Sequence, residues 1–504
     1  MRLNSKNSRP LASSPRLVLL LMFLGTSTMN AQDIPDRPEQ LEFATLDFQP
    51  PETSAFRHVL SNGVPVYLAP SHELPLVNIV FTFKGGEYLD PAGLLGMAHT
   101  TGDMIRRGGT RSISAEDMDE RLDFLASDVS VRVGTTSSMA SLNCLHGNLD
   151  ESLVLFLDML KHPGFQANRL DTYIGELIEG MAQRNDFPEA ILAREWDALL
   201  YGPDHFEARH PTRSMLQALT IQNLRSMHGI IFNPGNLIIA VNGDFEPQAM
   251  LDRLEEAMAD WESRPRVDDP PAPQHELKPG VYHVEHEIPQ GKVYIGSRGL
   301  TRNDPDFIPM LIANDILGGG AFTSRITGRV RDDEGLAYSA NSRLIPRINY
   351  PGEFRASFQS KNRTVPLAIK IILEEIGKMR DQPVSPVELE TAKNAFIESF
   401  PRRFQSKAGT LALFVDDELT GREPGYWRQF RDRIRNVTLD EVQRVMRDHL
   451  DPSTMAILVV GPWANIGPGD LEGRASMEEF FDGRVTAIPM KDPFTLQPIA
   501  QPPN

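Results

Sequence analysis

Two short segments of this 504-residue sequence carry polar side chains whose types and spacing could do chemistry. In the first, His99 and Asp103 are four residues apart. On a helix both side chains would lie on one face, so both could reach the same metal ion. In the second, Arg331 and Tyr338 follow a glycine-rich run. A guanidinium offers several fixed donors to peptide carbonyls or to a carboxylate, and a phenol donates one hydrogen bond toward a developing oxyanion.

The first segment, residues 96–104 with the sequence GMAHTTGDM, resembles the zinc helix of the peptidase M16 family, which includes pitrilysin, insulinase and mitochondrial processing peptidase. That helix reads H-x-x-E-H within a G-x-A-H-x-x-E-H-M frame. The resemblance places His99 at the first zinc ligand, Gly102 at the general base and Asp103 at the second histidine. Glu179 lies at the spacing of the third ligand of the family. The frame is retained, but two of its chemical residues are replaced.

The replaced residues leave two interpretations of this degenerate site. His99, Asp103 and Glu179 could form a retained metal site with one imidazole and two carboxylates. Alternatively, the site is empty and these side chains pair with each other or with water, which we favour on the number and type of ligands. In either case Gly102 cannot accept a proton, and loss of a positioned general base costs about 10²–10⁴ in rate. Glycine also weakens a helix by about 1 kcal/mol relative to alanine, so nothing local favours Gly102.

The second segment is more complete. Residues 317–325 (LGGGAFTSR) and 331–339 (RDDEGLAYS) resemble the C-terminal signature of the same family, L-G-G-x-x-x-S-R followed by R-x-x-x-G-L-A-Y-S. The resemblance implies that Arg331 and Tyr338 reach across a chamber toward the zinc site and bind the substrate backbone. Alternatively, Arg331 is a solvated helix charge beside Asp332 and Asp333, and Tyr338 is a strand aromatic in the core. Within the full signature we favour substrate binding.

An internal repeat indicates how the chain positions these segments. Three pairs of residues recur at one offset of 218: Thr220 with Thr438, Pro234 with Pro452, and Gly243 with Gly461. Each set predicts a Thr-capped helix, a Pro turn, a buried strand and a Gly stop, in the same order. Duplication of a whole domain explains a shared offset. Strands and helices mix without strict βαβ alternation, which indicates the α+β class. The resemblance implies two homologous M16-type domains (LuxS/MPP-like) forming half of a clamshell chamber.

Composition sets the domain boundaries. The proline cluster within 268–273 (DDPPAP) resists helix and strand, so we predict a linker at 266–280 between an N-terminal domain at 40–265 and a C-terminal domain at 281–465. A proline-containing tail follows at 466–504.

The alternation and spacing of apolar residues predict the following elements. Strands are expected at 64–68 and 77–83, and helices at 115–125, 153–160, 365–379 and 386–396.

Charge and the N-terminus limit the function. The formal net charge is −17, which disfavours nucleic acid and anionic membranes as partners because both repel an acidic surface. Residues 1–31 combine a basic start, the short apolar run LVLLLMFL and a small residue at Ala31, a pattern typical of a cleaved signal peptide. That run is too short to span a bilayer, which takes about 20 residues, so no stable membrane insertion is expected.

These features favour a periplasmic or secreted protein that is inactive alone. In bacterial members of the family one subunit often carries the zinc motif and the other the Arg/Tyr pair. We therefore expect a non-catalytic subunit that binds peptide, holds no cofactor itself and pairs with a zinc-bearing M16 homologue. One alternative is a weak stand-alone metalloendopeptidase that uses a metal at His99, Asp103 and Glu179. Another is a structural protein without a proteolytic role, as in respiratory-chain core subunits.

Overall fold

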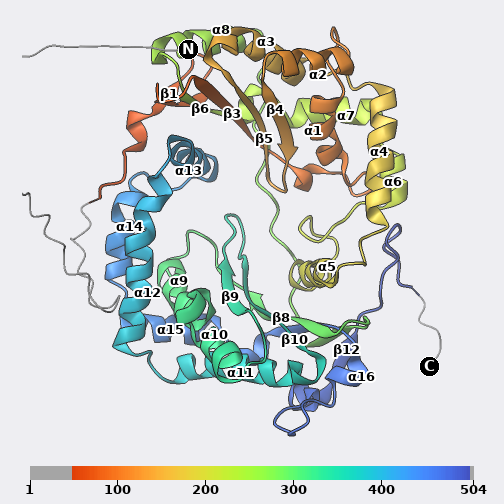
Figure 1. Ribbon diagram of the computed structural model, residues 1–504, viewed down its shortest axis with the longest axis vertical. Helices are drawn as coiled ribbons and strands as arrows, with labels where there is room; N and C mark the ends of the chain where they lie inside the picture. The colour runs from red at the N-terminus through yellow and green to blue at the C-terminus, as the bar shows by residue number, and fades with distance from the viewer. Residues whose placement is uncertain (1–47, 500–504) are drawn as a thin grey trace, which may run out of the picture. The chain divides into compact units, whose positions relative to one another are not determined.

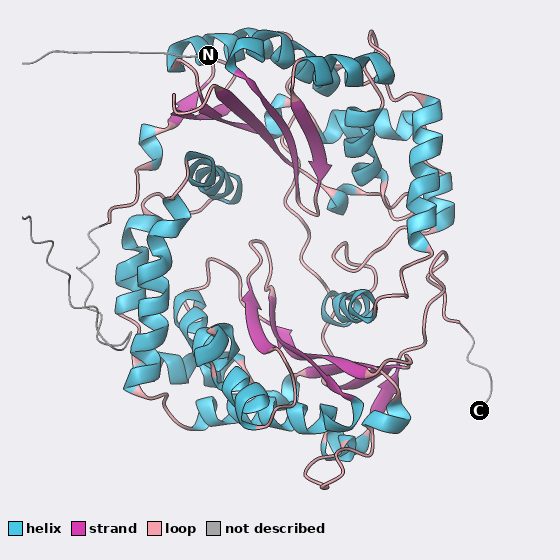
Figure 2. Cartoon of the chain, viewed as in Figure 1, coloured by secondary structure: helices cyan, strands magenta, loops and turns pink. Residues whose placement is uncertain are grey.

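A computed structural model of the protein describes residues 48–499, which belong to one compact unit beginning at Phe48. The predicted signal peptide at 1–31 lies outside the described residues. The chain builds two six-stranded sheets, shown in Figures 1 and 2. The first sheet has the order β1-β2-β6-β3-β5-β4. Its strands are β1 (Arg57–Val59), β2 (Pro65–Pro70), β3 (Leu76–Lys84), β4 (Asp128–Val133), β5 (Ser137–Leu145) and β6 (Leu237–Gly243).

The second sheet repeats the plan of the first. Its order is β12-β7-β11-β8-β10-β9. In both sheets one central pair is parallel, β2 with β6 and β7 with β11, and the next three pairings are antiparallel. Only the sixth strand differs, because β1 is antiparallel to β2 whereas β12 is parallel to β7. The strands are β7 (Gly280–Val284), β8 (Gln290–Arg298), β9 (Ala340–Ile345), β10 (Glu353–Lys361), β11 (Ala456–Val460) and β12 (Val485–Ala487).

The residues repeated at the offset of 218 occupy equivalent places in the two halves. Thr220 caps α7 (Ile221–Ile231) and Thr438 caps α15 (Leu439–His449), each with a reciprocal capping box. A proline turn follows each helix and leads into the central strand, β6 or β11. The α+β class is confirmed, and the matching sheet orders explain why three separate anchors share one offset.

The helices cover the sheets, and the elements predicted from apolar spacing are present with small shifts at their ends. The longest helix is α11. The helices are α1 (Met97–Arg107), α2 (Ala115–Phe124), α3 (Leu149–Lys161), α4 (Ala167–Met181), α5 (Pro188–Tyr201), α6 (Arg213–Gln217), α7, α8 (Pro247–Met258), α9 (Phe307–Asn314), α10 (Arg325–Thr327), α11 (Val365–Asp381), α12 (Pro386–Ser399), α13 (Lys407–Thr420), α14 (Tyr426–Arg435), α15 and α16 (Trp463–Ile466).

Two helices pack on the sheet of the opposite half. α5 precedes the linker in sequence, yet its buried face packs on the second sheet, where Trp196 donates a hydrogen bond from Nε1 to Glu353 Oε2 at 2.6 Å. α13 follows the linker and packs on β2 and β6 of the first sheet, where Tyr67 donates to Glu418 at 2.6 Å. Figure 1 shows α13 beside the first sheet and α5 beside the second. This exchange joins the halves through buried contacts.

The segment between the halves has neither helix nor strand across residues 259–279, as expected for a proline-rich linker, but it is held by hydrogen bonds. Tyr88 donates to the carbonyl of Asp268, and His205 contacts that of Pro271. The tail also contacts the first half, since Arg184 and Asn185 donate to carbonyls of residues 493 and 491. The predicted boundaries at 265, 281 and 465 remain predictions, and the second sheet extends past 465 through β12.

The junction around α5 predicts a pH effect on stability. Asp197 is half-buried near Glu353, Glu207, Arg355 and Arg347, and burial, followed by the two carboxylates, raises its pKa to about 7. A carboxyl group with a raised pKa favours folding when protonated, so its contribution is complete below pH ~4 and is lost as the pH rises toward 7. Asp197→Asn should therefore melt at a higher temperature than wild type at pH 8, with the difference shrinking at pH 4. Melting curves of both proteins across this range check the prediction, and a difference independent of pH would contradict it.

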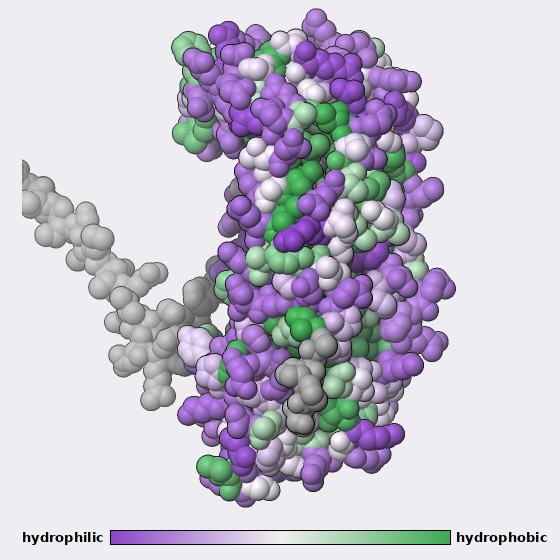
Figure 3. Space-filling view, turned by 90° about the vertical axis from the view of Figure 1, so that its right-hand side faces the viewer, coloured by the Kyte–Doolittle hydropathy of each residue, from purple (hydrophilic) through white to green (hydrophobic). Residues whose placement is uncertain are grey.

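The surface is mostly hydrophilic. Figure 3 shows one face, where hydrophobic residues gather in a band in the upper part and hydrophilic residues cover most of the rest. Within residues 48–499, no helix combines the length and apolar composition that crossing a membrane requires.

Candidate functional site

Helix α1 carries the degenerate motif, and its start is fixed by a carboxylate from outside the helix. The chain enters α1 through Gly96, which adopts a left-handed conformation with φ 88°. The buried Asp90 accepts hydrogen bonds from the backbone N–H groups of Gly96 at 2.7 Å and Ala98 at 2.8 Å. These bonds satisfy donors that a helix start leaves free. Burial nevertheless raises the pKa of Asp90 to about 6.

His99 and Asp103 lie on one face of α1, as their spacing predicts, but they contact each other. His99 Nε2 lies 3.3 Å from Asp103 Oδ2, and His99 Nδ1 lies 3.6 Å from Glu87 Oε1. Tyr173 of α4 donates to the same Asp103 oxygen at 2.7 Å. Burial, followed by this hydrogen bond, raises the pKa of Tyr173, so the phenol stays protonated and remains a donor. Burial also raises the pKa of Glu87.

Glu179 does not join this group. Its side chain is exposed on α4, whereas Glu176, one helical turn earlier, lines the same pocket as His99 and forms an ion pair with Arg107 at 2.7 Å. The Arg107 guanidinium also lies 4.8 Å from the centre of the Tyr173 ring. Within residues 48–499, no group of three His, Cys, Asp or Glu side chains is arranged to hold a metal ion. Sequence reasoning missed Glu87, Tyr173 and Glu176, because only the fold brings them to α1.

Gly102 has a packing role that comes from a strand distant in sequence, which the local sequence does not indicate. The residue is buried where α1 crosses β4. A Cβ atom added to Gly102 would lie 2.7 Å from Val133 Cγ2, closer than carbon atoms approach in folded proteins. The glycine therefore lets the helix approach the sheet edge closely, and this contact offsets its low helix propensity.

These contacts decide whether a family-type zinc ion fits the residues of α1. Zinc in such a site takes three protein ligands and leaves a position for water. His99 is the one imidazole that α1 supplies, the Asp103 oxygen nearest to it already accepts from Tyr173, and Glu179 lies elsewhere. No carboxylate stands at position 102 to take a proton from bound water. The residues present do not fit a catalytic zinc site.

A pocket remains beside the motif. It has a volume of about 420 Å³, and its charged lining includes Glu87, His99, Arg184 and Arg209. Apolar side chains of α4, such as Leu177 and Met181, line it as well. A concave site with both apolar and charged walls suits a small part of a peptide, such as a side chain or a chain end.

The second segment forms an exposed cluster instead of a core. Its backbone is unusual, with π-helical turns at Asp315–Gly319 and Gly328–Asp333 and with Ala321 in a left-handed conformation at φ 46°. Such irregular backbone is common at functional sites. It presents Phe322, whose side chain is 72% exposed. The Arg331 guanidinium lies 4.8 Å from the centre of the Phe322 ring and 5.8 Å from that of Tyr338.

The exposure of this cluster bears on the two interpretations of Arg331 and Tyr338 that the sequence left open, substrate binding or a structural role. Tyr338 is 87% exposed, so the interpretation as a core aromatic was wrong. Arg331 also lies 3.6 Å from Asp332, so the charge does have the acidic neighbour that the sequence suggested. Cation–π contacts with two exposed rings nevertheless place the guanidinium between aromatic surfaces. Phe322 was not singled out from the sequence, since only the strained residue before it explains its exposure.

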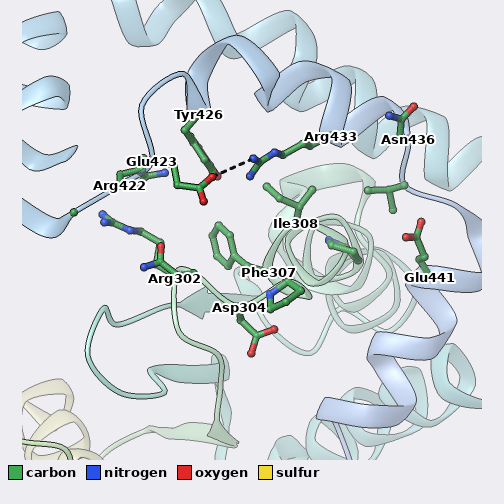
Figure 4. Close-up of a pocket in the computed structure, with 15 residues that line it drawn as sticks. Arg302, Asp304, Phe307, Ile308, Arg422, Glu423, Tyr426, Arg433, Asn436 and Glu441 are labelled. Atoms are coloured by element: carbon green, nitrogen blue, oxygen red, sulfur yellow. Dashed lines mark ion pairs between the residues drawn. The ribbon is translucent and has the colours of Figure 1, made fainter. Parts of the chain in front are cut away.

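A larger pocket lies away from both motifs. It has a volume of about 680 Å³ between the start of α9 and α14 (Figure 4). Its arginines are matched by acids, because Arg302 pairs with Asp416, Arg422 pairs with Asp417, and Arg433 lies 3.8 Å from Glu423. Charge compensation of this kind is typical of a structural surface.

Known proteins resemble this chain over most of its length. Residues 218–396 match the family described as the peptidase M16 inactive domain. A non-peptidase homologue named YmxG from Helicobacter pylori is 23% identical over 81% of this chain and 95% of its own. A peptidase M16 inactive domain from Pseudomonas fluorescens superposes with a TM-score of 0.72 at 23% identity, over 81% of this chain and 97% of its own. The periplasmic protease PqqL from Escherichia coli gives a TM-score of 0.67 at 15% identity, over 84% of this chain and 48% of its own.

Proposed function

We propose that this chain, which is similar to proteins of the peptidase M16 inactive-domain type, is the non-catalytic, peptide-binding subunit of a periplasmic zinc metallopeptidase heterodimer. A zinc-bearing M16 homologue would supply the catalytic residues, and the two chains would each form half of a chamber. The observation that carries the proposal is the exposed cluster of Phe322, Arg331 and Tyr338. An exposed aromatic pair around a guanidinium buries little within this chain, so its surface is available to a partner or substrate.

Peptide is the ligand class that the cluster suits. Arg331 has several N–H donors that can reach backbone carbonyls, and the Tyr338 phenol adds one more donor. The Phe322 and Tyr338 rings offer apolar faces to peptide side chains without being specific for one sequence. The pocket beside His99 supplies a second place for part of a chain. Nucleic acid is a poor ligand for a surface with a net charge of −17.

The need for a catalytic partner follows from the residues that α1 carries at the positions of the family's zinc motif. The groups that could bind zinc or activate water are replaced by Gly102, packed against Val133, and by Asp103, bonded to Tyr173. The periplasmic setting is supported by the signal-like residues 1–31 and by the description of the Escherichia coli relative as a periplasmic protease.

A mixing experiment tests this function. The purified chain, a zinc-bearing M16 homologue from the same genome and their mixture are assayed with a fluorogenic peptide library. The chain alone should be inactive, and the mixture should exceed the homologue alone. Tyr338→Phe should lower the kcat of the mixture about 10²-fold if its hydroxyl stabilises the oxyanion. Phe322→Ala should raise KM about 10-fold through lost apolar contact.

Phe124→Ala provides a matched control, because Phe124 is 79% exposed and lies 5.9 Å from the Arg121 guanidinium, an arrangement similar to that of Phe322 with Arg331. It should leave the kinetics unchanged. Zinc bound stoichiometrically by the isolated chain and lost in His99→Ala would favour a stand-alone metalloendopeptidase instead. A mixture no more active than the homologue alone would favour a structural role.

A further inference from the structure

A small pocket in the first half, distinct from the pocket that His99 lines, gathers basic residues on this acidic protein. It has a volume of about 330 Å³ and lies between the end of α3, the polar side of α7 and the segment that follows α8. Its acids are Asp260 and Glu262, and Trp261 contributes an aromatic wall. Its basic residues are Arg111, Lys161, His162, Arg225, His228 and Arg264.

Some of these groups are already engaged. Lys161 forms an ion pair with Asp260, and His162 Nδ1 lies 3.1 Å from Asp158. His228 Nε2 donates to the carbonyl of Leu160 at 2.7 Å. Burial lowers the pKa of His228, and nearby arginines lower it further against the opposing effect of that bond, which favours the neutral imidazole at pH 7. The remaining charges belong to Glu262 and to three arginines.

Those arginines lack acidic partners. Among residues 48–499, no ion pair with a carboxylate is found for Arg111, Arg225 or Arg264. In a protein with a net charge of −17, most arginines elsewhere have an acid within reach, as in the larger pocket of Figure 4. Three unpaired guanidinium groups at one concavity create a local positive potential that attracts anions.

Arg264 is held in place by two glycines. Its backbone N–H donates to Asn233 at 3.2 Å, and its carbonyl lies so near Gly235 that a Cβ there would approach to 1.8 Å. Its Nη1 donates to the carbonyl of Gly229 at 3.2 Å, and a Cβ at Gly229 would lie 2.4 Å from that nitrogen. One donor fixes the guanidinium across α7, which leaves the other donors free. A fixed guanidinium loses less entropy when it binds a ligand.

We propose that this pocket binds the phosphate group of a small phosphorylated molecule. A phosphate monoester carries two negative charges and several acceptor oxygens, which match guanidinium groups in bidentate pairs. The volume leaves room beside the phosphate for the rest of a small molecule, which Trp261 would contact. This site is separate from the peptide cluster and does not depend on the function proposed above.

Calorimetric titration of the full chain with inorganic phosphate and with glycerol 3-phosphate tests the site. Both should bind saturably at one site, more weakly as salt rises because the attraction is electrostatic. Arg111→Ala and Arg225→Ala should each weaken binding about 10-fold or more through the loss of a charge-assisted pair. Both residues are exposed, so these variants should fold. Acetate, a monoanion, should bind more weakly than phosphate.

Two further variants sharpen the result. Arg402→Ala also removes one exposed arginine, but outside the pocket, and should leave the affinity unchanged. Gly229→Ala should weaken binding without removing any charge, because the added methyl group displaces the Arg264 guanidinium. The proposal fails if wild type shows no saturable phosphate binding. It also fails if Arg402→Ala loses as much affinity as Arg225→Ala, or if acetate binds as tightly as phosphate.

Discussion

Gly102→Glu, which restores the residue type of the family's general base, should destabilise the protein by several kcal/mol and should not create a hydrolase. The new Cβ would lie 2.7 Å from Val133 Cγ2, and overpacking of this kind costs about 1–3 kcal/mol. The carboxylate adds a further cost, because position 102 is buried. Urea denaturation measures the loss, and a peptide assay with added zinc measures the activity.

Gly102→Ala separates packing from charge. Alanine gains about 1 kcal/mol of helix propensity but meets the same contact, so the net effect should be destabilising. Gly175→Ala is the matched control, since Gly175 is also within a helix and a Cβ there meets nothing within 4 Å. That change should stabilise the protein by up to about 1 kcal/mol. Val133→Ala should relieve part of the cost when it is combined with Gly102→Ala. Equal effects of alanine at 102 and 175 would contradict the packing argument.

The same contact shows that motif loss in this chain involves more than the replacement of a general base and one zinc ligand. The space that a Glu side chain at position 102 would occupy is filled by β4, so the helix and the sheet edge are complementary in shape. Restoring Glu at 102 and His at 103 therefore requires repacking of β4 before any chemistry can follow. Asp103→His alone would remove the acceptor of the Tyr173 hydroxyl and leave that buried phenol without its bond.

The parts of the fold that could be predicted are those encoded locally. The caps at Thr220 and Thr438 and the strands after the proline turns each depend on a few adjacent residues, so the repeat and the α+β class follow from the sequence. The close approach at Gly102 could not be predicted, because Val133 reaches it only through the pairing of β4 with β5. In isolation, glycine within a helix indicates only weakness.

The candidate site shows the same division. The contact of His99 with Asp103 follows from four-residue spacing, which any helix imposes. Glu176 lines the pocket where the family's spacing had predicted Glu179. Which of the two glutamates faces the pocket depends on the rotation of α4 about its own axis, and the tertiary packing of α4 sets that rotation. The exposure of Phe322 depends on a left-handed alanine and on π-helical turns, and neither has a reliable signal in a single sequence.

Trp196→Ala should be the most destabilising single substitution in the junction between the halves. Trp196 is fully buried on α5, packs on the second sheet and donates to Glu353 at 2.6 Å. Removing a buried tryptophan side chain costs about 3–5 kcal/mol, and the Glu353 carboxylate would lose a buried donor worth about 1–3 kcal/mol. Because α5 belongs to the first half in sequence, the loss should loosen the contact between the halves as well as the local packing.

Trp196→Phe distinguishes the two contributions, since phenylalanine retains most of the packing and only removes the donor. It should cost less than Trp196→Ala, and Glu353→Gln should lower the penalty of Trp196→Phe because a neutral amide needs less compensation. Urea midpoints of Trp196→Phe, Glu353→Gln and the double variant that combines them give the coupling energy between the two side chains, and the midpoint of Trp196→Ala gives the full cost of removing the indole. Hydrogen exchange should show faster exchange in both α5 and β8 in Trp196→Ala. Faster exchange confined to α5 would mean that the second sheet does not depend on this helix, and the exchanged packing of α5 would then contribute little to holding the two halves together.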